Sequence, residues 1–450
     1  MKSLRDILAT SNWKALEKYC NELVASEMAR NGAAMEGKRY YENDNGIRRK
    51  KRVDELLAGA RRDRNPLRNA DFRVSHNWHQ LLVNQKASYM FTYPPMFDCG
   101  IDVINEKINA VLGEEFPRKV KNLAIDAANC GIAWLHCWVD SKGNFHYNTV
   151  PMEEIYPLYD GGLDPSMEYL LRIYDIRERD DSMVRKVEIW NEREALFFRK
   201  ESTGSLEPDR CFDRGKYCWE HGMGEIPFVP FYNNRSHSGD LSMVKDLIDQ
   251  YDLVVSGFAN DLADIQEVIF VLRNYGGEDL NTFLSELKRY KAIKVEGDSL
   301  NAGGVETMSI EIPIEARVKF LEILKRQIFI SGQGVDPDPA AFGNSSGVAL
   351  KYLYSLLEIK AGLLETEFRS GFKTFLRLVL RYLNAPEDLP VIQIYTRNAI
   401  ENDLEAAEIA QKSEGLISRE TVLRNHPWVE NLALERESLA HQTGSGTEKN

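Results

Sequence analysis

The stretch of this sequence that comes nearest to a catalytic motif is a serine between two glycines. Gly343-Asn344-Ser345-Ser346-Gly347 matches the G-x-S-x-G turn that presents a nucleophilic serine in hydrolases. That turn needs a buried strand directly before it, whereas residues 336–341 contain two prolines that disfavour a strand. A loop followed by a serine-capped helix explains the same residues. A soluble hydrolase that uses Ser345 is therefore kept only as the alternative function.

Two pairs of carboxylates in the middle of the chain could bind a metal ion or transfer protons. Asp249 and Asp252, like Asp261 and Asp264, are three residues apart, which places each pair on one face of a helix. Acidic helix surface, or pairing with Lys and Arg of other helices or subunits, is a commoner use of such residues. No further ligand residue singles these pairs out, so the sequence predicts no metal site.

Cysteine and histidine spacing does not favour zinc chemistry either. Cys211, Cys218 and His221 fit no common zinc pattern and lack a fourth ligand, so free thiols in a reducing cytosol are expected. His76 and His79 lack the glutamate of a metalloprotease helix and are expected to be structural. The phosphate-binding G-x-x-x-x-G-K-[ST] and dinucleotide-binding G-x-G-x-x-G patterns do not occur. The sequence therefore predicts a protein that is not an enzyme and has no cofactor.

The element behind the serine is unusually long. No proline follows Gly347 until Pro386, and the apolar residues between them recur at helical spacing: Leu353, Leu356, Leu357, Leu364, Phe368, Phe372, Phe375, Val379 and Leu383. This pattern predicts one helix of about 37 residues, about 55 Å long. A typical globular helix is about a third of that length. Such helices suit a ring of identical subunits, where they can lie side by side and line a channel.

The remaining pattern predicts an α+β, mostly helical chain. Its expected elements are a helix capped at residues 11–13 and running to about 31, a helix over 77–90, a hairpin of 134–139 and 145–150, strands at 168–176, 185–190 and 195–200, an extended connector at 226–234, a helix over 239–265, a small insert at 266–312 with strands at 268–273 and 292–296 around a helix at 280–290, a helix over 314–331, and after Pro386 a strand at 391–395 and two helices. Residues 1–235 are expected to form one α+β unit.

Charge and composition limit the partners. The chain has 450 residues, 43% hydrophobic and 28% charged, which is an ordinary folded composition without an apolar run of about 18 residues for a membrane span. A net charge of −12 argues against static, sequence-specific DNA binding but permits DNA that must slide past acidic walls. Residues 38–68 carry 11 Lys and Arg against 5 Asp and Glu, which we interpret as a solvated basic face.

In their order and spacing, several stretches together resemble a phage portal protein of the SPP1 type. They are Tyr40-Tyr41 to Ile47, the helix from Asn77 to Phe91, Val150-Pro151 to Asp160, Ile226 to Phe231, Leu247 to Asp252 with Ser256, Asn260 and Asp261, Phe342 to Lys351, and Gly415 to Thr421 with Val429 and Glu435. One departure is Thr92-Tyr93-Pro94, which stands where the family usually has Gly-Lys-Pro. The resemblance spans nearly the whole chain.

The resemblance implies the portal-protein fold, with wing, stem, clip and crown assembled as a ring around a central channel. The implied segments are a wing at 1–237, a first stem helix at 238–265, a clip at 266–312, a second stem helix at 313–331, a tunnel loop at 332–347, a long wing/tunnel helix at 348–385, and a crown at 386–450. The loop would face the DNA, with these candidate contact residues: Asp336, Asp338, Phe342, Asn344, Ser345, Ser346 and Lys351.

The same resemblance implies the partners and the place of action. We expect a homo-oligomeric ring, commonly of twelve subunits, in the virion at one vertex of the capsid. Double-stranded viral DNA would pass through it without tight binding. The terminase large subunit would dock for packaging, the head-tail adaptor proteins would follow for DNA retention and ejection, and the major capsid and scaffold proteins would surround the ring. The protein would be made in the host bacterial cytoplasm, with no membrane partner.

Overall fold

A computed structural model of the chain describes residues 4–50, 70–163, 165–178, 181–210, 215–264, 269–273, 304–308, 313–337, 347–397, 403–413, 415–424, 429, 435–436 and 439. The described chain divides into two compact units. Unit 1 comprises Met1–Glu42, His79–Met243 and Phe329–Asn450, and unit 2 comprises Asn43–Trp78 and Val244–Ile328. Helix accounts for 51% of the described residues and strand for 20%, which confirms the predicted α+β, mostly helical class.

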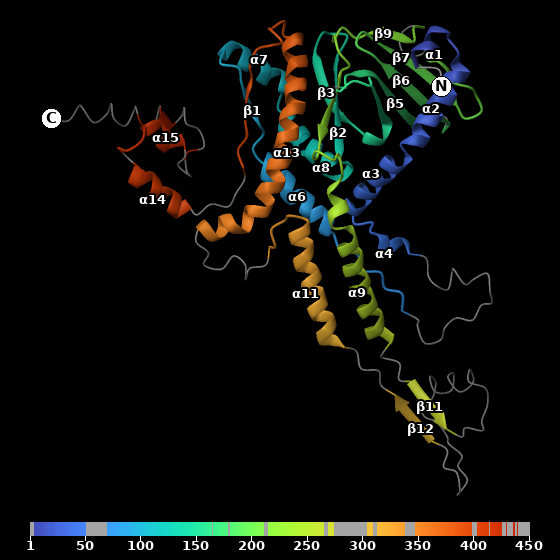
Figure 1. Cartoon of the computed structure of the whole chain (residues 1–450), viewed down its shortest axis with the longest axis vertical. Coiled ribbons are helices and arrows are strands. Elements are labelled where there is room, and N and C mark those ends of the chain that lie inside the picture. Colours follow the sequence, from blue (N-terminus) through green and yellow to red (C-terminus); the bar gives the residue numbers. More distant parts are fainter. Residues whose placement is uncertain are drawn as a thin grey trace, which may run out of the picture. The chain divides into compact units, whose positions relative to one another are not determined.

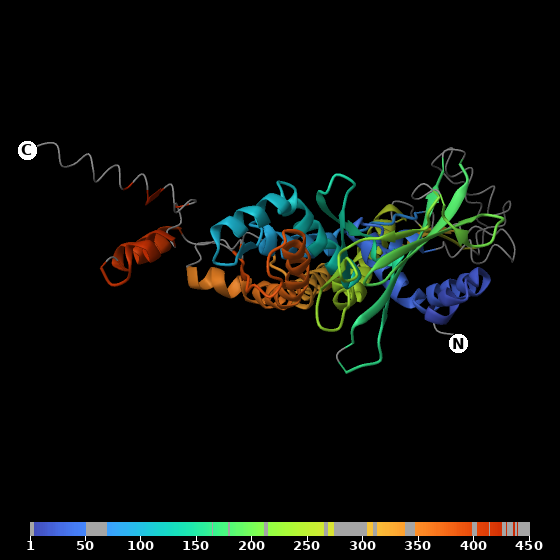
Figure 2. The same cartoon turned by 90° about the horizontal axis from the view of Figure 1, so that it is seen from above.

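An antiparallel sheet of six strands forms one part of unit 1. Its order is β4 (Ile155–Tyr159), β5 (Met167–Arg177), β6 (Met183–Trp190), β7 (Glu194–Glu201) and β8 (Glu207–Pro208), with β9 (Cys218–Glu220) also paired to β7. Helices α1 (Leu4–Ala9) and α2 (Trp13–Ser26) bury Leu4, Ile7 and Leu16 against this sheet (Figure 2, blue helices). Asn12 caps α2 by accepting a hydrogen bond from the Ala15 amide, as the sequence predicted, and α3 (Met28–Tyr41) follows directly.

A second sheet of unit 1 has the order β10-β2-β3. The predicted hairpin is confirmed: β2 (Ile132–Val139) pairs with β3 (Phe145–Val150) in antiparallel register. The expected connector was wrong in part, because Phe228–Tyr232 forms strand β10 and pairs with β2. Pro230 is tolerated there because β10 is an edge strand, where a missing backbone N–H removes no ladder hydrogen bond on the outer side.

The long helix is the central element of unit 1 (Figure 1). Helix α13 (Gly347–Tyr382) has 36 residues, so the predicted helix is confirmed to within a few residues at its end. Phe368, Phe372 and Phe375 are at most 1% exposed, and each such ring contributes about 1.5–3 kcal/mol through burial. A Cβ atom on Gly371 would lie 2.6 Å from the Phe231 ring, so only glycine lets β10 approach the helix this closely.

Three further helices and two small elements complete the core around α13. Helices α6 (Trp78–Phe91), α7 (Asp102–Leu112) and α8 (Phe116–Cys130) contribute Met90, Ile108 and Leu123 to the same apolar cluster. Strand β1 (Met96–Asp98) pairs with β13 (Ile392–Ile394), close to the predicted strand at 391–395. The short helices η1 (Met152–Glu154) and η2 (Asp240–Met243), with α14 (Asp403–Ser413) and α15 (Arg419–Arg424) in the tail, are the remaining elements described in this unit.

Unit 2 is built on two helices. These are α9 (Lys245–Asp264) and α11 (Ile314–Ser331), which lie side by side in Figure 1; the last three residues of α11 belong to unit 1. Arg317 of α11 joins them, because its guanidinium pairs with Asp261 at 2.5 Å and covers the Phe258 ring. Both helices match their predicted ranges, except that a 3-10 turn, η2, opens the first.

The remaining described elements of unit 2 are short. Helix α4 (Gly46–Arg49) lies within the basic stretch 38–68, and β11 (Ile269–Arg273) pairs antiparallel with β12 (Gly304–Met308). The strand predicted at 268–273 is confirmed, and β12 was missed. The predicted helix at 280–290 and strand at 292–296 lie outside the described residues. Within the described part of the chain, no helix is both long and apolar enough to cross a membrane.

Candidate functional site

The predicted tunnel loop enters the described structure at its base. Residues 332–337 are described. Gly332 and Gln333 form a turn, and residues 334–337 are neither helix nor strand. Asp336 is half-buried there. Asp338, Phe342, Asn344, Ser345 and Ser346 lie outside the described residues, and Lys351 is described only as backbone in the second turn of α13. The geometry therefore concerns how the loop is anchored.

A glutamine of α6 fixes the first residues of the loop. The Gln85 amide donates from Nε2 to the Val335 carbonyl at 2.7 Å and accepts at Oε1 from the Val335 N–H at 3.0 Å. Val335 is buried, so this one side chain satisfies both of its backbone polar groups. A Cβ atom on Gly334 would lie 2.4 Å from Leu82 Cδ2 and 2.8 Å from Gln85 Oε1, so a larger residue there would displace the side chains that form this clamp.

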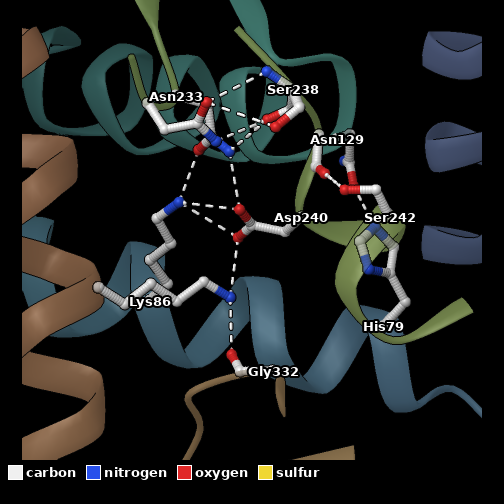
Figure 3. A network of polar contacts seen from close by, with 11 residues as sticks. His79, Lys86, Asn129, Asn233, Ser238, Asp240, Ser242 and Gly332 are labelled. Carbon is white, nitrogen blue, oxygen red and sulfur yellow. Dashed lines mark hydrogen bonds and ion pairs between the residues drawn. The ribbon is translucent and has the colours of Figure 1, made fainter. Parts of the chain in front are cut away.

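A lysine of the long helix holds the residue at which the loop begins. Lys360 Nζ donates to the Gly332 carbonyl at 2.8 Å and forms an ion pair with Asp240 Oδ2 at 2.9 Å. Gly332 comes directly after α11, whereas Asp240 lies in η2, shortly before α9. Within unit 1, one ammonium group thus joins the segment that precedes α9 to the segment that follows α11 (Figure 3).

A second lysine, from α6, completes the ion network around the carboxylate. Lys86 Nζ lies 3.1 Å from Asp240 Oδ2 and donates to Asn233 Oδ1 at 2.6 Å. Asn233 Nδ2 in turn donates to Asp240 Oδ1 at 2.7 Å and to the Ser238 carbonyl at 2.9 Å (Figure 3). Lys86, Asp240 and Lys360 are 2%, 3% and 4% exposed, so two cations share one carboxylate almost without water.

Burial and charge act in opposite directions on these groups. Burial alone would raise the pKa of Asp240, but Lys360, Lys86 and the Asn233 hydrogen bond outweigh it and hold that pKa well below its usual range. Burial lowers the pKa of Lys86 to about 8; Asp240 opposes this shift and Lys360 adds to it. The carboxylate therefore stays ionised at neutral pH, whereas Lys86 loses its proton more readily than a lysine in water does.

A buried histidine lies beside the network in a neutral state. His79 Nε2 is 2.9 Å from Asn129 Oδ1, and burial lowers the pKa of His79 to about 4. Because Asn129 Oδ1 can only accept, His79 carries its proton on Nε2. This agrees with the structural role expected for His79. His76, the second histidine expected to be structural, lies in unit 2, where its Nδ1 is 2.7 Å from Asp252 Oδ1.

The other candidates from the sequence have ordinary partners. Asp249 pairs with Lys245 on its own helix, and Asp261 pairs with Arg317 across helices. Among the described residues, no group of three or more His, Cys, Asp or Glu could hold a metal ion. Cys218 donates to Glu194, and both ring nitrogens of His221 have backbone partners, at Asn191 and Met223. Cys211 and the Asp264 side chain lie outside the description.

Sequence reasoning missed the anchoring residues Gln85, Lys86, Asp240 and Lys360. A signal was present for both lysines, because each occupies the apolar stripe of its helix. Lys86 is four residues from both Leu82 and Met90, and Lys360 falls three residues after Leu357, on the same buried face. A lysine inside such a stripe predicts a buried cation and hence a buried acidic partner. The sequence offers no comparable signal for Gln85.

Comparison with known proteins gives a consistent result. The family described as "Phage portal protein, SPP1 Gp6-like" matches residues 25–446. The chain is 46% identical over 435 residues to the portal protein of Clostridium phage phiCD119, covering 93% of this chain and 94% of that protein. It is 30% identical over 413 residues to the portal protein of Bacillus phage SPP1, covering 88% of this chain and 80% of that protein.

A comparison with solved structures finds similarity to chains from particle necks. One is the neck of an empty GTA particle computed with C6 symmetry, with a TM-score of 0.44 and 12% identity over 77% of this chain and 88% of that chain. Another is the neck of a native GTA particle computed with C12 symmetry, with a TM-score of 0.42, 12% identity and the same shares of both chains.

Proposed function

Because this chain belongs to the SPP1 Gp6-like family of phage portal proteins, we propose that its residues 332–347 line the DNA channel and guide the moving duplex without binding it tightly. A portal protein is a structural, non-enzymatic component of the virion that forms a homo-oligomeric ring. The serine-hydrolase alternative finds no support, because the family and the relatives that the chain matches are portal proteins.

The anchored base of the loop is the observation that carries this proposal. Gln85 and Lys360 hold the backbone at Val335 and Gly332, so the base of the loop has a fixed position in unit 1. A fixed base followed by short polar side chains suits a surface along which a phosphate backbone slides. Acidic groups at 336 and 338 repel phosphates, so no deep binding minimum forms along the path.

The further partners follow from the same proposal. Twelve copies would surround double-stranded viral DNA at one capsid vertex, among major capsid and scaffold proteins. The terminase large subunit would supply the ATP hydrolysis for packaging, and head-tail adaptor proteins would later dock for DNA retention and ejection. The segments proposed for these roles are the wing, stem, clip and crown at the boundaries given above, with synthesis in the host bacterial cytoplasm.

A charge reversal in the loop tests the proposal. The double variant Asp336→Lys with Asp338→Lys should assemble into rings of normal mass, because the substitutions leave Gln85, Lys86, Asp240 and Lys360 in place. It should package less DNA, because phosphates would be retained. Native mass spectrometry measures assembly, and DNase-protected DNA per particle measures packaging. Glu192→Lys with Glu207→Lys is the matched control, because both side chains are exposed and the change in net charge is the same. Normal packaging by the loop variant would overturn the proposal.

A further inference from the structure

Helix α9 carries a row of polar side chains that face another segment of unit 2. Asp252, Ser256 and Asn260 follow one another at intervals of four residues and so lie along one face of the helix. Asp252 is fully buried and Ser256 is 3% exposed. Buried polar groups need hydrogen-bond partners, and in unit 2 each of these three bonds to one short segment, Ala70–His76.

We call each of the three side chains, with the residue that it binds, a rung. In the first two rungs, Asn260 and Ser256 each bind the backbone N–H and C=O of a single residue. Asn260 Oδ1 accepts from the Phe72 N–H at 2.6 Å, and its Nδ2 donates to the Phe72 carbonyl at 3.4 Å. Ser256 Oγ accepts from the Val74 N–H at 3.0 Å and lies 3.3 Å from the Val74 carbonyl, to which it donates. An amide or a hydroxyl can do this because each offers a donor and an acceptor.

The third rung needs a helper, because a carboxylate can only accept. Asp252 Oδ1 accepts from the His76 N–H at 3.0 Å. The His76 carbonyl is satisfied instead by Asn45, whose Nδ2 donates to it at 2.9 Å and to Asp252 Oδ2 at 2.6 Å. All three rungs therefore satisfy the N–H and the C=O of alternate residues, as a neighbouring strand would do in a sheet.

The spacing of helix and segment agrees over the whole row. Four residues of helix advance about 6 Å, and two residues of extended chain advance about 6.6 Å, so three rungs accumulate a mismatch of only about 1 Å. No side chain of residues 70–76 is fully buried, although the His76 ring also contacts Asp252 and Tyr251. At Phe72 and Val74, the hydrogen bonds from α9 go to backbone atoms and do not involve the side chains.

We propose that Asp252, Ser256 and Asn260 form a docking strip for an extended polypeptide backbone, and that Ala70–His76 occupies this strip as a releasable strap. The partner is thus an extended segment of this chain. It is chosen by its covalent attachment and, at Phe72 and Val74, not by its side chains. Continuity with α6, which begins at Trp78, keeps the strap at a high local concentration beside the strip. Because no buried side chain anchors it, the strap can detach without opening a core.

A proline comparison tests the backbone contact, with hydrogen exchange over residues 70–77 as the readout. Val74→Pro removes the N–H that Ser256 accepts, whereas the Arg73 N–H has no partner in the described structure, so Arg73→Pro removes none. Exchange of the remaining strap amides should rise about fivefold to tenfold in Val74→Pro, as expected for one lost hydrogen bond, and stay near wild type in Arg73→Pro. Val74→Ala and Arg73→Ala control for the lost side chains. Equal effects of the two prolines would overturn the proposal.

A second comparison asks whether side chains matter and whether the strap detaches alone. Replacing Phe72 and Val74 together by alanine should leave strap exchange unchanged, whereas Ser256→Ala with Asn260→Ala should accelerate it more than either single change. In that strip variant, amides of β5 and β6 in unit 1 should exchange as in wild type. Faster exchange in the variant with alanine at positions 72 and 74 would show that the side chains hold the strap. A loss of protection throughout unit 1 in the variant with alanine at positions 256 and 260 would show that the strap does not detach by itself.

Discussion

The network at the loop base in unit 1 and the strip on α9 in unit 2 solve one problem in different ways. Each connects segments distant in sequence through buried polar side chains. At the loop base, two ammonium groups and a carboxylate pair with one another, and backbone groups are secondary. On α9, side chains form hydrogen bonds with backbone groups, and the first two rungs, at Asn260 and Ser256, carry no charge. A buried charge that loses its partner destabilises the fold strongly, whereas a neutral rung can break by itself with a small loss of free energy.

Asp240→Asn should separate the two regions most sharply. The substitution leaves Lys86 and Lys360 facing each other almost without water, so we expect a loss of about 3–5 kcal/mol in the free energy of unfolding. Urea denaturation of the purified chain, followed by circular dichroism, measures it. Asp249→Asn is the control: its pair with Lys245 is about one-third exposed, so the expected loss is about 1 kcal/mol or less. Similar losses in both variants would show that the network is not a tight ion cluster.

Lys86→Met should reveal the charge state of the network through pH. The pKa of Lys86 is about 8 in the folded chain, against an ordinary lysine pKa of 10.5 in the unfolded chain, so between these pH values the unfolded chain holds more protons. Stability therefore rises with pH across this window, by at most about 1.4 kcal/mol per pH unit, and falls again as pH drops toward 8. Denaturation midpoints from pH 7 to 10 should show this rise relative to Lys86→Met, which lacks the group. If stability changed with pH in the same way in both proteins, the pKa of Lys86 would not be lowered in the folded chain.

The sequence predicted the elements of both regions better than their contacts. Helix periodicity located α9, α11 and α13 to within a few residues, because each carries an apolar stripe that local spacing reveals. The pairing of Asp240 with Lys360, 120 residues apart, depends on tertiary packing that no local pattern encodes. Asp252 was noticed only as half of a carboxylate pair, since helical spacing cannot show that Ala70–His76 lies along α9.

Gln85→Ala should have a smaller effect than the charge changes and should act on the loop itself. It leaves the buried N–H and C=O of Val335 without their partner, for an expected loss of about 1–3 kcal/mol. Hydrogen exchange should rise first at residues 332–337. Asn84→Ala, an exposed neighbour on α6, is the control and should change stability by about 0.5 kcal/mol or less. If α13 lost protection before the loop base did, the clamp would not be the element that fixes the loop.

Ser256→Ala should give the smallest change, and it tests the comparison at its weakest contact. Val74 is half-buried, so water can replace part of what the hydroxyl supplied, and we expect a loss of about 1 kcal/mol. Alanine is also the better helix former by about 0.5 kcal/mol, which masks part of that loss. Ser370→Ala on the exposed face of α13 measures this propensity term alone, so the difference between the two variants isolates the rung. A difference as large as that for Asp240→Asn would mean that the strip is as tightly coupled as the ion network, and the strap could not detach by itself.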